Sequence, residues 1–253
     1  MKVPTPPDPA RPTDWQRLRA PAKLTTNLRI TGVREDGYHL IDAEMVTLDL
    51  ADELRIGPGD GLAITYEDDV GPGLGLGEPG DNLILKALEL VDRRVAVELL
   101  KRIPPGAGLG GGSADAAAIL RWAGMVDPTR AVELGADVAF CVVGGRARVR
   151  GIGEQITPLA FRSQTFTLLT PSFGCSTVAV YQQWDRMGGP TGEWGNDLEP
   201  AALVVEPALA VARDQLGARS GLRPRLAGSG STWFVEGAFD GPGLVVASTI
   251  PGL

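Results

Sequence analysis

PPGAGLGGGSAD, at residues 104–115, sets five glycines between a pair of prolines and an alanine-rich segment. The prolines end a predicted strand over residues 95–103, and the alanines predict a helix that Ser113 opens and that ends near Gly124. Glycines let backbone N–H groups come close to a ligand, and a helix N-terminus adds unpaired donors and a partial positive charge. The stretch is therefore typical of a phosphate-binding loop, although a surface turn before a capped helix has the same composition. Ser113 supplies either an N-cap oxygen or a hydroxyl for a phosphate-bound metal.

The same loop also fits the pattern Gly-x-Gly-x-x-Gly through Gly106, Gly108 and Gly111, which is a weak match to a dinucleotide-binding turn. Two prolines separate the predicted strand from the loop, where a Rossmann turn is tight. The acidic residue expected about 20 residues further on falls at Asp127, which is followed directly by a proline. No Gly-Lys-Ser/Thr follows, so the loop is not a Walker A motif. A Rossmann-type nicotinamide-dependent oxidoreductase therefore stays as the less favoured alternative.

The segments on either side of the loop predict two α+β domains. The elements expected before it are strands over 22–33, 43–50, 53–57 and 62–66 and a helix over 82–94 capped by Asp81. The elements expected after it include helices over 176–186 and 197–217. Strands and helices follow one another without regular β-α alternation, which disfavours a single doubly wound sheet. We predict a proline-rich disordered tail over residues 1–18, an N-terminal domain over 19–155 and a C-terminal domain over 156–253.

The composition narrows the function classes. The chain has 253 residues with one histidine and two cysteines, so its sequence offers neither a His/Cys metal cluster nor a disulfide scaffold. Its net charge of −7 argues against a nucleic-acid partner, which needs a basic surface. No apolar run approaches about 18 residues, and the first residues lack the apolar core of a signal peptide. We therefore predict a cytoplasmic protein with no membrane partner.

Three polar positions stand out: Lys23, Asp137 and the pair Tyr38-His39. The chain has only four lysines among 24 basic residues, so Lys23 is a candidate functional charge or else an ordinary solvated side chain. Asp137 precedes an apolar run, where a partly desolvated carboxylate needs a partner such as a lysine, unless it only caps its turn. Tyr38-His39 follows an Asp-Gly turn and suits stacking on a base, although an isolated histidine is commonly structural.

Taken in order along the chain, these motifs resemble the GHMP kinase superfamily from about residue 19 to residue 235. The motifs that carry the resemblance are Pro21-Ala22-Lys23-Leu24, Arg34 with Asp36-Gly37-Tyr38-His39, Asp81-Asn82-Leu83, Pro104 through Asp115, Gly135-Ala136-Asp137-Val138, Gly153-Glu154, Asn196-Asp197-Leu198 and Gly228-Ser229-Gly230. The glycine-rich motif alone indicates the superfamily. The Pro-Ala-Lys and Asp-Gly-Tyr-His motifs together narrow it to members whose acceptor substrate carries a cytidine diphosphate group.

The resemblance implies an α+β fold of two domains, a ribosomal-protein-S5-like N-terminal domain and a ferredoxin-like C-terminal domain, with the active site in the cleft between them. It implies a small-molecule kinase that transfers the γ-phosphate of ATP, with Mg²⁺, to a hydroxyl of the acceptor. In this family, Asp137 corresponds to the catalytic base. Lys23 corresponds to the lysine that orients this aspartate and offsets charge at the γ-phosphate.

The resemblance also assigns the binding residues. The nucleotide site consists of Asn82 on the adenine side and, around the phosphates, Pro104, Gly106, Gly108, Leu109, Gly110, Gly111, Gly112 and Ser113. Ser113 is also the residue expected near Mg²⁺. The acceptor substrate is bound by Asp137 and by Tyr38, His39 and Tyr181, the last three at the cytosine ring.

Some features leave alternatives open or depart from the family pattern. Another acceptor, mevalonate-like or homoserine-like, is the alternative within the superfamily, and the expected oligomeric state is a monomer or a homodimer. The family usually has asparagine where this chain has Thr25, and proline where it has Ala139. The turn Gly228-Ser229-Gly230 is either a plain hairpin turn or a second small-residue turn packed against the phosphate loop.

Overall fold

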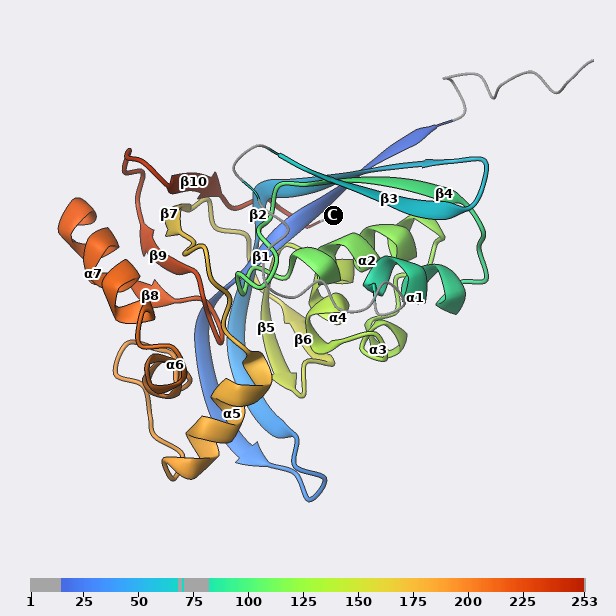
Figure 1. Cartoon of the computed structure of the whole chain (residues 1–253). Helices are drawn as coiled ribbons and strands as arrows, with labels where there is room; N and C mark the ends of the chain where they lie inside the picture. The colour runs from blue at the N-terminus through green and yellow to red at the C-terminus, as the bar shows by residue number, and fades with distance from the viewer. Residues whose placement is uncertain (1–14, 68–69, 71–81, 253) are drawn as a thin grey trace, which may run out of the picture.

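The computed structural model describes residues 15–67, 70 and 82–252. The tail predicted over residues 1–18 lies outside this part as far as residue 14, but β1 already begins at Gln16, which pairs with Ile56. Asp81, the predicted helix cap, and most of the glycine-rich segment before it also lie outside the described residues. The described chain forms two sheets with helices packed against them (Figure 1).

The first sheet has six strands in the order β3-β4-β2-β5-β6, with β1 paired to β2 outside this path. Its strands are β1 (Gln16–Val33), β2 (His39–Gly57), β3 (Gly61–Tyr66), β4 (Ala96–Lys101), β5 (Arg146–Gly151) and β6 (Gln155–Pro158). The segments predicted as two strands over 43–50 and 53–57 form the single long strand β2. Of the described strand pairs in this sheet, β3 and β4 alone run parallel. This topology removes the structural basis for the Rossmann alternative, which requires a parallel sheet.

Strand β1 is irregular at the point where the sequence motifs place Lys23. Its pairing with β2 shifts register between Pro21 and Lys23 and again between Thr25 and Asn27. At the second shift the extra residue lies on β1, which makes a bulge there, and bulges bend a strand and redirect its side chains; at the first shift the extra residues lie on β2. Lys23 and Thr25 on this strand are both buried, although both are polar.

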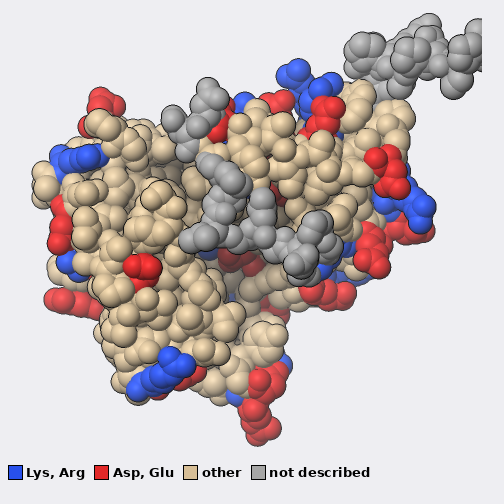
Figure 2. All heavy atoms as spheres, viewed as in Figure 1, with Lys and Arg blue, Asp and Glu red and all other residues tan. Residues whose placement is uncertain are grey.

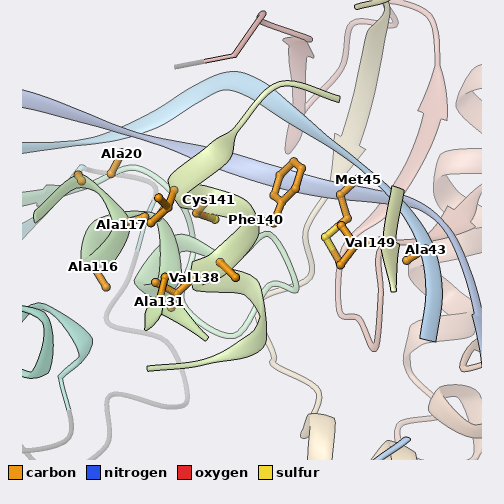
Figure 3. Close-up of a cluster of buried hydrophobic side chains, with 14 of the residues drawn as sticks. Ala20, Ala43, Met45, Ala116, Ala117, Ala131, Val138, Phe140, Cys141 and Val149 are labelled. Atoms are coloured by element: carbon orange, nitrogen blue, oxygen red, sulfur yellow. The ribbon is translucent and has the colours of Figure 1, made fainter. Parts of the chain in front are cut away.

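Four helices cover one face of the first sheet: α1 (Leu83–Leu90), α2 (Gly111–Trp122), α3 (Pro128–Ala131) and α4 (Ala136–Val143) (Figure 1). The helix predicted over 82–94 ends at Leu90, and its N-cap is Asn82, whose side chain accepts a hydrogen bond from Ile84 N–H at 2.8 Å. The alanines of α2 are buried, and their small side chains let this helix pack closely on α4 and the sheet. Figure 3 shows Ala116 and Ala117 of α2 and Val138, Phe140 and Cys141 of α4 as members of this core.

The second sheet is antiparallel, with strand order β10-β7-β9-β8. Its strands are β7 (Thr165–Leu169), β8 (Arg225–Leu226), β9 (Trp233–Glu236) and β10 (Leu244–Ser248), and its helices are α5 (Thr177–Arg186), α6 (Glu199–Val205) and α7 (Leu209–Ser220). The helical segment predicted over 197–217 is two helices, because Pro207 lies between them and cannot donate a helical hydrogen bond. The predicted α+β class therefore holds for both halves. The predicted domain boundary at 155/156 falls inside β6, which pairs with β5 in the first sheet.

The two halves meet along short backbone contacts. Thr232 N–H donates to the carbonyl of Ala107 in the glycine-rich loop at 3.1 Å, and Leu28 N–H donates to the carbonyl of Gly195 at 2.8 Å. These bonds place the 228–230 turn of the second half against the loop of the first. In the part of the chain that is described, none of the helices has the length and apolar character needed to cross a membrane.

Candidate active site

A cavity of about 650 Å³ lies between the two halves. The predicted site residues that line it are Lys23, Tyr38, His39, Gly108, Ser113, Asp137 and Tyr181. The structure therefore brings together the proposed base, its lysine, part of the phosphate loop and the three rings, although these residues lie up to 158 positions apart in the sequence.

Lys23 and Asp137 form an ion pair in this cavity. The Lys23 side chain lies inside, only 6% exposed, with its Nζ 3.0 Å from Asp137 Oδ2. Asp137 lies in the first turn of α4, where the helix dipole favours a negative charge, and its side chain is 33% exposed. The solvated interpretation of Lys23 is therefore wrong, because the side chain is buried against a carboxylate that still faces the cavity.

Thr25 is the second partner of Lys23. The Lys23 ammonium donates to Thr25 Oγ1 at 3.2 Å, and Thr25 also lines the cavity. The position where the family pattern usually has asparagine thus keeps a polar side chain that binds the lysine. Its side chain is buried beside the Lys23–Asp137 pair.

The glycine-rich loop passes close to both halves of the molecule. A Cβ at Gly108 would lie 2.4 Å from the carbonyl oxygen of Gly230, so the two turns pack backbone to backbone. A Cβ at Gly110 would lie 2.7 Å from Lys23 Cγ. Gly110 also has a φ of +67°, which side-chain-bearing residues rarely adopt. The turn at 228–230 therefore packs against the loop, which was one of the two interpretations of its sequence.

The start of α2 differs from the prediction by two residues. The helix begins at Gly111, with Gly110 as an N-cap that has no side chain, so Ser113 is not the cap. Ser113 instead lines the cavity, which leaves its hydroxyl available for a ligand. Of the two roles expected for Ser113, the capping role is wrong.

Several residues assigned to the nucleotide site do not line this cavity. Leu109 is buried and contributes its carbonyl, which accepts from Lys23 N–H at 3.0 Å. Asn82 uses its side chain to cap α1, next to the start of α2. Five more of the assigned residues are likewise not among those that line the cavity: Pro104, Gly106, Gly110, Gly111 and Gly112. Their assignment to nucleotide binding stays a prediction.

The other end of the cavity is aromatic. The His39 ring lies 4.7 Å from the Tyr181 ring and 5.5 Å from the Trp184 ring, between centroids, and His39 Nε2 lies 2.8 Å from Asp185 Oδ1. Burial, together with the charge of Asp137, raises the pKa of Tyr181 to about 12, so its hydroxyl stays neutral. Tyr38 lies at the hairpin end of β2, with its side chain largely exposed at the rim. The three predicted rings thus belong to one end of the same cavity.

The sequence motifs pointed to Tyr181 of α5 but not to Thr177 and Asp185 of the same helix. Thr177, Tyr181 and Asp185 are four positions apart and all line the cavity. That spacing puts side chains on one face of a helix, so the predicted helix over 176–186 carried a usable signal. Ser229 is also a lining residue, and its hydroxyl is 2.8 Å from that of Thr177.

The residues present fit a magnesium ion that arrives with a nucleotide. The described residues hold no group of three or more His, Cys, Asp or Glu side chains that could bind a metal on its own. Mg²⁺ is commonly held by one or two carboxylates or hydroxyls together with substrate phosphates. The Ser113 hydroxyl and the Asp137 carboxylate at the cavity are such a partial set.

The charged side chains that line the cavity are one lysine, Lys23, and three aspartates, Asp36, Asp137 and Asp185. On the face in Figure 2, acidic and basic side chains are interspersed, and the chain as a whole carries a net charge of −7. Inside the cavity, the positive contributions come from Lys23 and from the N-terminal end of α2. An anionic ligand is therefore held by local donors rather than by the field of the whole molecule.

This fold and this site define the class of GHMP kinases. Two α+β halves enclose one cleft, and the glycine-rich loop, the N-terminus of α2 and the Lys23–Asp137 pair meet there. Residues 82–145 match the model of the GHMP kinases N terminal domain. A crystal structure of 4-(cytidine 5'-diphospho)-2C-methyl-D-erythritol kinase superposes with a TM-score of 0.69 at 29% identity, covering 92% of this chain and 98% of that one. The mevalonate kinase of L. major superposes with a TM-score of 0.63 at 14% identity, covering 93% of this chain and 96% of that one, and so shows the shared fold alone.

Curated relatives narrow the class. The 4-diphosphocytidyl-2-C-methyl-D-erythritol kinase of Paracoccus denitrificans is 39% identical over 238 residues, which are 87% of this chain and 86% of that protein. The kinase of the same name from Rhodopseudomonas palustris is 34% identical over 92% of both chains. The chain belongs to the family of 4-diphosphocytidyl-2-C-methyl-D-erythritol kinases. The nicotinamide-dependent oxidoreductase alternative is therefore wrong.

Proposed function

We propose that this protein is an ATP-dependent kinase that phosphorylates the 2-hydroxyl of 4-diphosphocytidyl-2-C-methyl-D-erythritol, in the non-mevalonate synthesis of isoprenoid precursors. The observation that carries the proposal is the Lys23–Asp137 pair, 3.0 Å apart in a cavity that also contains the glycine loop and an aromatic end. Two curated relatives named as this kinase, at 39% and 34% identity, support the choice of substrate.

The proposed reaction moves one proton and one phosphoryl group. Asp137 accepts the proton of the acceptor hydroxyl while the hydroxyl oxygen bonds to the γ-phosphorus, and the bond from that phosphorus to the bridging oxygen of ADP breaks. Lys23 orients the carboxylate and places a positive charge beside the transferring group. Such a transfer depends mainly on positioning and charge stabilisation, and it needs no covalent enzyme intermediate.

In this proposal the glycine loop and the start of α2 hold the phosphates through backbone N–H groups. Ser113 and Asp137 are the residues that would hold Mg²⁺. When bound, the ion neutralises charge on the β- and γ-phosphates.

The aromatic end recognises the cytosine. Tyr181 and Tyr38 offer ring faces for stacking, and His39, held by Asp185, offers a ring at a fixed angle. This end belongs to the same cavity as the Lys23–Asp137 pair, as expected when one substrate spans from base to reacting hydroxyl. A cytoplasmic location and a monomeric or homodimeric state remain predictions.

The test is release of ADP by the purified chain with ATP and Mg²⁺, with and without the cytidyl substrate. We expect release only with that substrate and a product heavier by one phosphoryl group in mass spectrometry. Mevalonate and homoserine serve as competing acceptors. Turnover of one of these, with none of the cytidyl substrate, would overturn the proposed substrate but retain the kinase class.

The variant Asp137→Asn tests the assigned base. We expect turnover to fall by about 10²–10⁴-fold, because the amide cannot accept the hydroxyl proton. Asp214→Asn, on the exposed face of α7, is the matched control and keeps its turnover. Circular dichroism checks that both variants fold, and retained turnover in Asp137→Asn removes Asp137 as the base.

A further inference from the structure

A buried cluster of three charged side chains lies behind the glycine-rich loop. Lys101, the last residue of β4, donates from Nζ to Asp115 Oδ2 at 2.9 Å and also to the carboxylate of Asp52 in β2. All three side chains are at most 6% exposed. Lys101 and Asp115 are not among the residues that line the cavity, so they belong to its support rather than to its surface.

The cluster holds both ends of the loop. At the start, Asp52 Oδ1 accepts hydrogen bonds from the backbone N–H groups of Arg102 at 2.5 Å and Ile103 at 2.8 Å. At the end, Asp115 belongs to the second turn of α2 and is bound to Lys101. The segment between these anchors is mostly glycine and proline, which offer few side chains to fix their own backbone.

The Lys101 ammonium also lies directly against the first residue of α2. A Cβ at Gly111 would be 3.0 Å from Lys101 Nζ, so a side chain at this position would crowd the ammonium. The other oxygen of Asp115, Oδ1, has no hydrogen-bond partner among the described residues. The hydrogen bond from Lys101 therefore connects the side-chain carboxylate of Asp115, and with it α2, to the sheet.

We infer that Lys101 and Asp115 are positioning residues, which fix the start of α2 and the end of the glycine-rich loop so that their backbone N–H groups stay directed at the nucleotide phosphates. The inference rests on the proposed function in that it takes ATP as the ligand of this loop. It adds a role for two residues that touch neither the nucleotide nor the acceptor.

Asp115→Ala is the informative variant. Lys101 keeps Asp52 as its counter-ion, so no buried charge is left unpaired, and alanine is a strong helix former. The variant removes the link from the sheet to α2 and the negative charge beside Asp52. Asp115→Asn is the conservative variant, because its amide oxygen still accepts from Lys101. Ile119→Val, a buried truncation in the same helix, is the matched control for packing loss.

Affinity for ATP with Mg²⁺ is measured by titration calorimetry without any acceptor, and KM values are measured by ADP release. For Asp115→Ala we expect affinity for ATP to fall about tenfold, as for loss of one charge-assisted hydrogen bond, with KM for the acceptor within about twofold. Asp115→Asn recovers most of the affinity, and Ile119→Val keeps it. The melting temperature of each variant shows whether it is folded at the temperature of the titration.

Two results would overturn the inference. One is Asp115→Ala binding ATP as the unmodified chain does. The other is an equal loss of ATP affinity in Ile119→Val, which would show that any loss of packing in α2 weakens ATP binding. If Asp115→Ala does not fold, Asp115→Asn with a tenfold loss of ATP affinity also counts against the inference. Because the titration needs no acceptor, a failure of the proposed substrate leaves this test intact.

Discussion

Lys23 shows how a single residue depends on its neighbours for its role. The pairing of β1 with β2 is irregular on both sides of it, and its side chain reaches the cavity, where it binds two oxygens, one on Asp137 and one on Thr25. The Asp137 contact gives it a part in the proposed chemistry. The Thr25 contact gives it a fixed direction, because a lysine with two partners has fewer accessible rotamers.

Thr25→Val tests this second contact. Valine matches threonine in shape but cannot accept from the Lys23 ammonium, so we expect kcat to fall by about three- to thirtyfold while the fold is retained. Thr25→Ser restores the oxygen and most of the rate. The control is Thr47→Val, which removes a buried hydroxyl that has no hydrogen-bond partner among the described residues and that lies opposite Lys23 on β2. A rate loss in the control as large as in Thr25→Val would contradict the assignment.

At the scale of one element, the glycine-rich loop is fixed by what surrounds it. Gly108 packs on the backbone of the 228–230 turn, Gly110 packs on the stem of Lys23, and Gly111 packs on the Lys101 ammonium. Each of these glycines is required by a close neighbour on a different element. The loop therefore contacts β1, the end of β4 and the second half of the molecule, in addition to its proposed role in binding phosphates.

Gly110→Ala separates crowding from backbone strain. The new Cβ would enter a space 2.7 Å from Lys23 Cγ at a φ of +67°, so we expect a stability loss of about 2–5 kcal/mol and a lower kcat as Lys23 moves. Gly124→Ala is the matched control, because Gly124 ends the same helix at a φ of +80° with open space around it. We expect it to lose only about 1–2 kcal/mol and no activity. Urea unfolding and ADP release measure both, and equal losses would contradict the crowding argument.

The sequence predicted most elements at this scale and missed what depends on distant contacts. The glycine stretch, the alanine helix after it and the pairing of Asp137 with a lysine follow from residue types and local spacing. The burial of Lys23 does not, because β-bulges depend on how β1 pairs with β2 and break the alternation that sequence patterns assume. The role of Ser113 was also missed. Gly110 adopts the αL conformation as the N-cap, so α2 begins at Gly111, two residues before its predicted start. Asp185 and Thr177 were missed because helical spacing identifies a shared face but not what that face meets.

At the scale of the whole molecule, the cavity exists because the second half presents a turn to the first. Gly228 and Ser229 form one wall, and a Cβ at Gly228 would lie 3.8 Å from Lys23 Nζ. Asn196 holds this turn from behind: its Nδ2 donates to the carbonyls of Leu226 at 2.9 Å and Gly228 at 2.7 Å. Its Oδ1 accepts from Leu198 N–H at 2.9 Å, a local bond in the segment that leads into α6, so the two Nδ2 bonds tie this segment to the turn.

Asn196→Ala therefore tests whether the geometry between the halves depends on this residue. Asn196 is buried, so its removal leaves two carbonyls and one N–H without their partners, and we expect a stability loss of about 3 kcal/mol. For a chain of this size, the melting temperature then falls by about 6–12 °C. Because Gly228 and Ser229 line the cavity, kcat/KM for the acceptor should fall more than the affinity for ATP does. Asn27→Ala, at an exposed position on β1, is the control and changes stability by less than about 0.5 kcal/mol. If Asn196→Ala loses stability but keeps its full kcat/KM at a temperature where it is folded, the turn is held by the Thr232–Ala107 bond and its own packing rather than by Asn196.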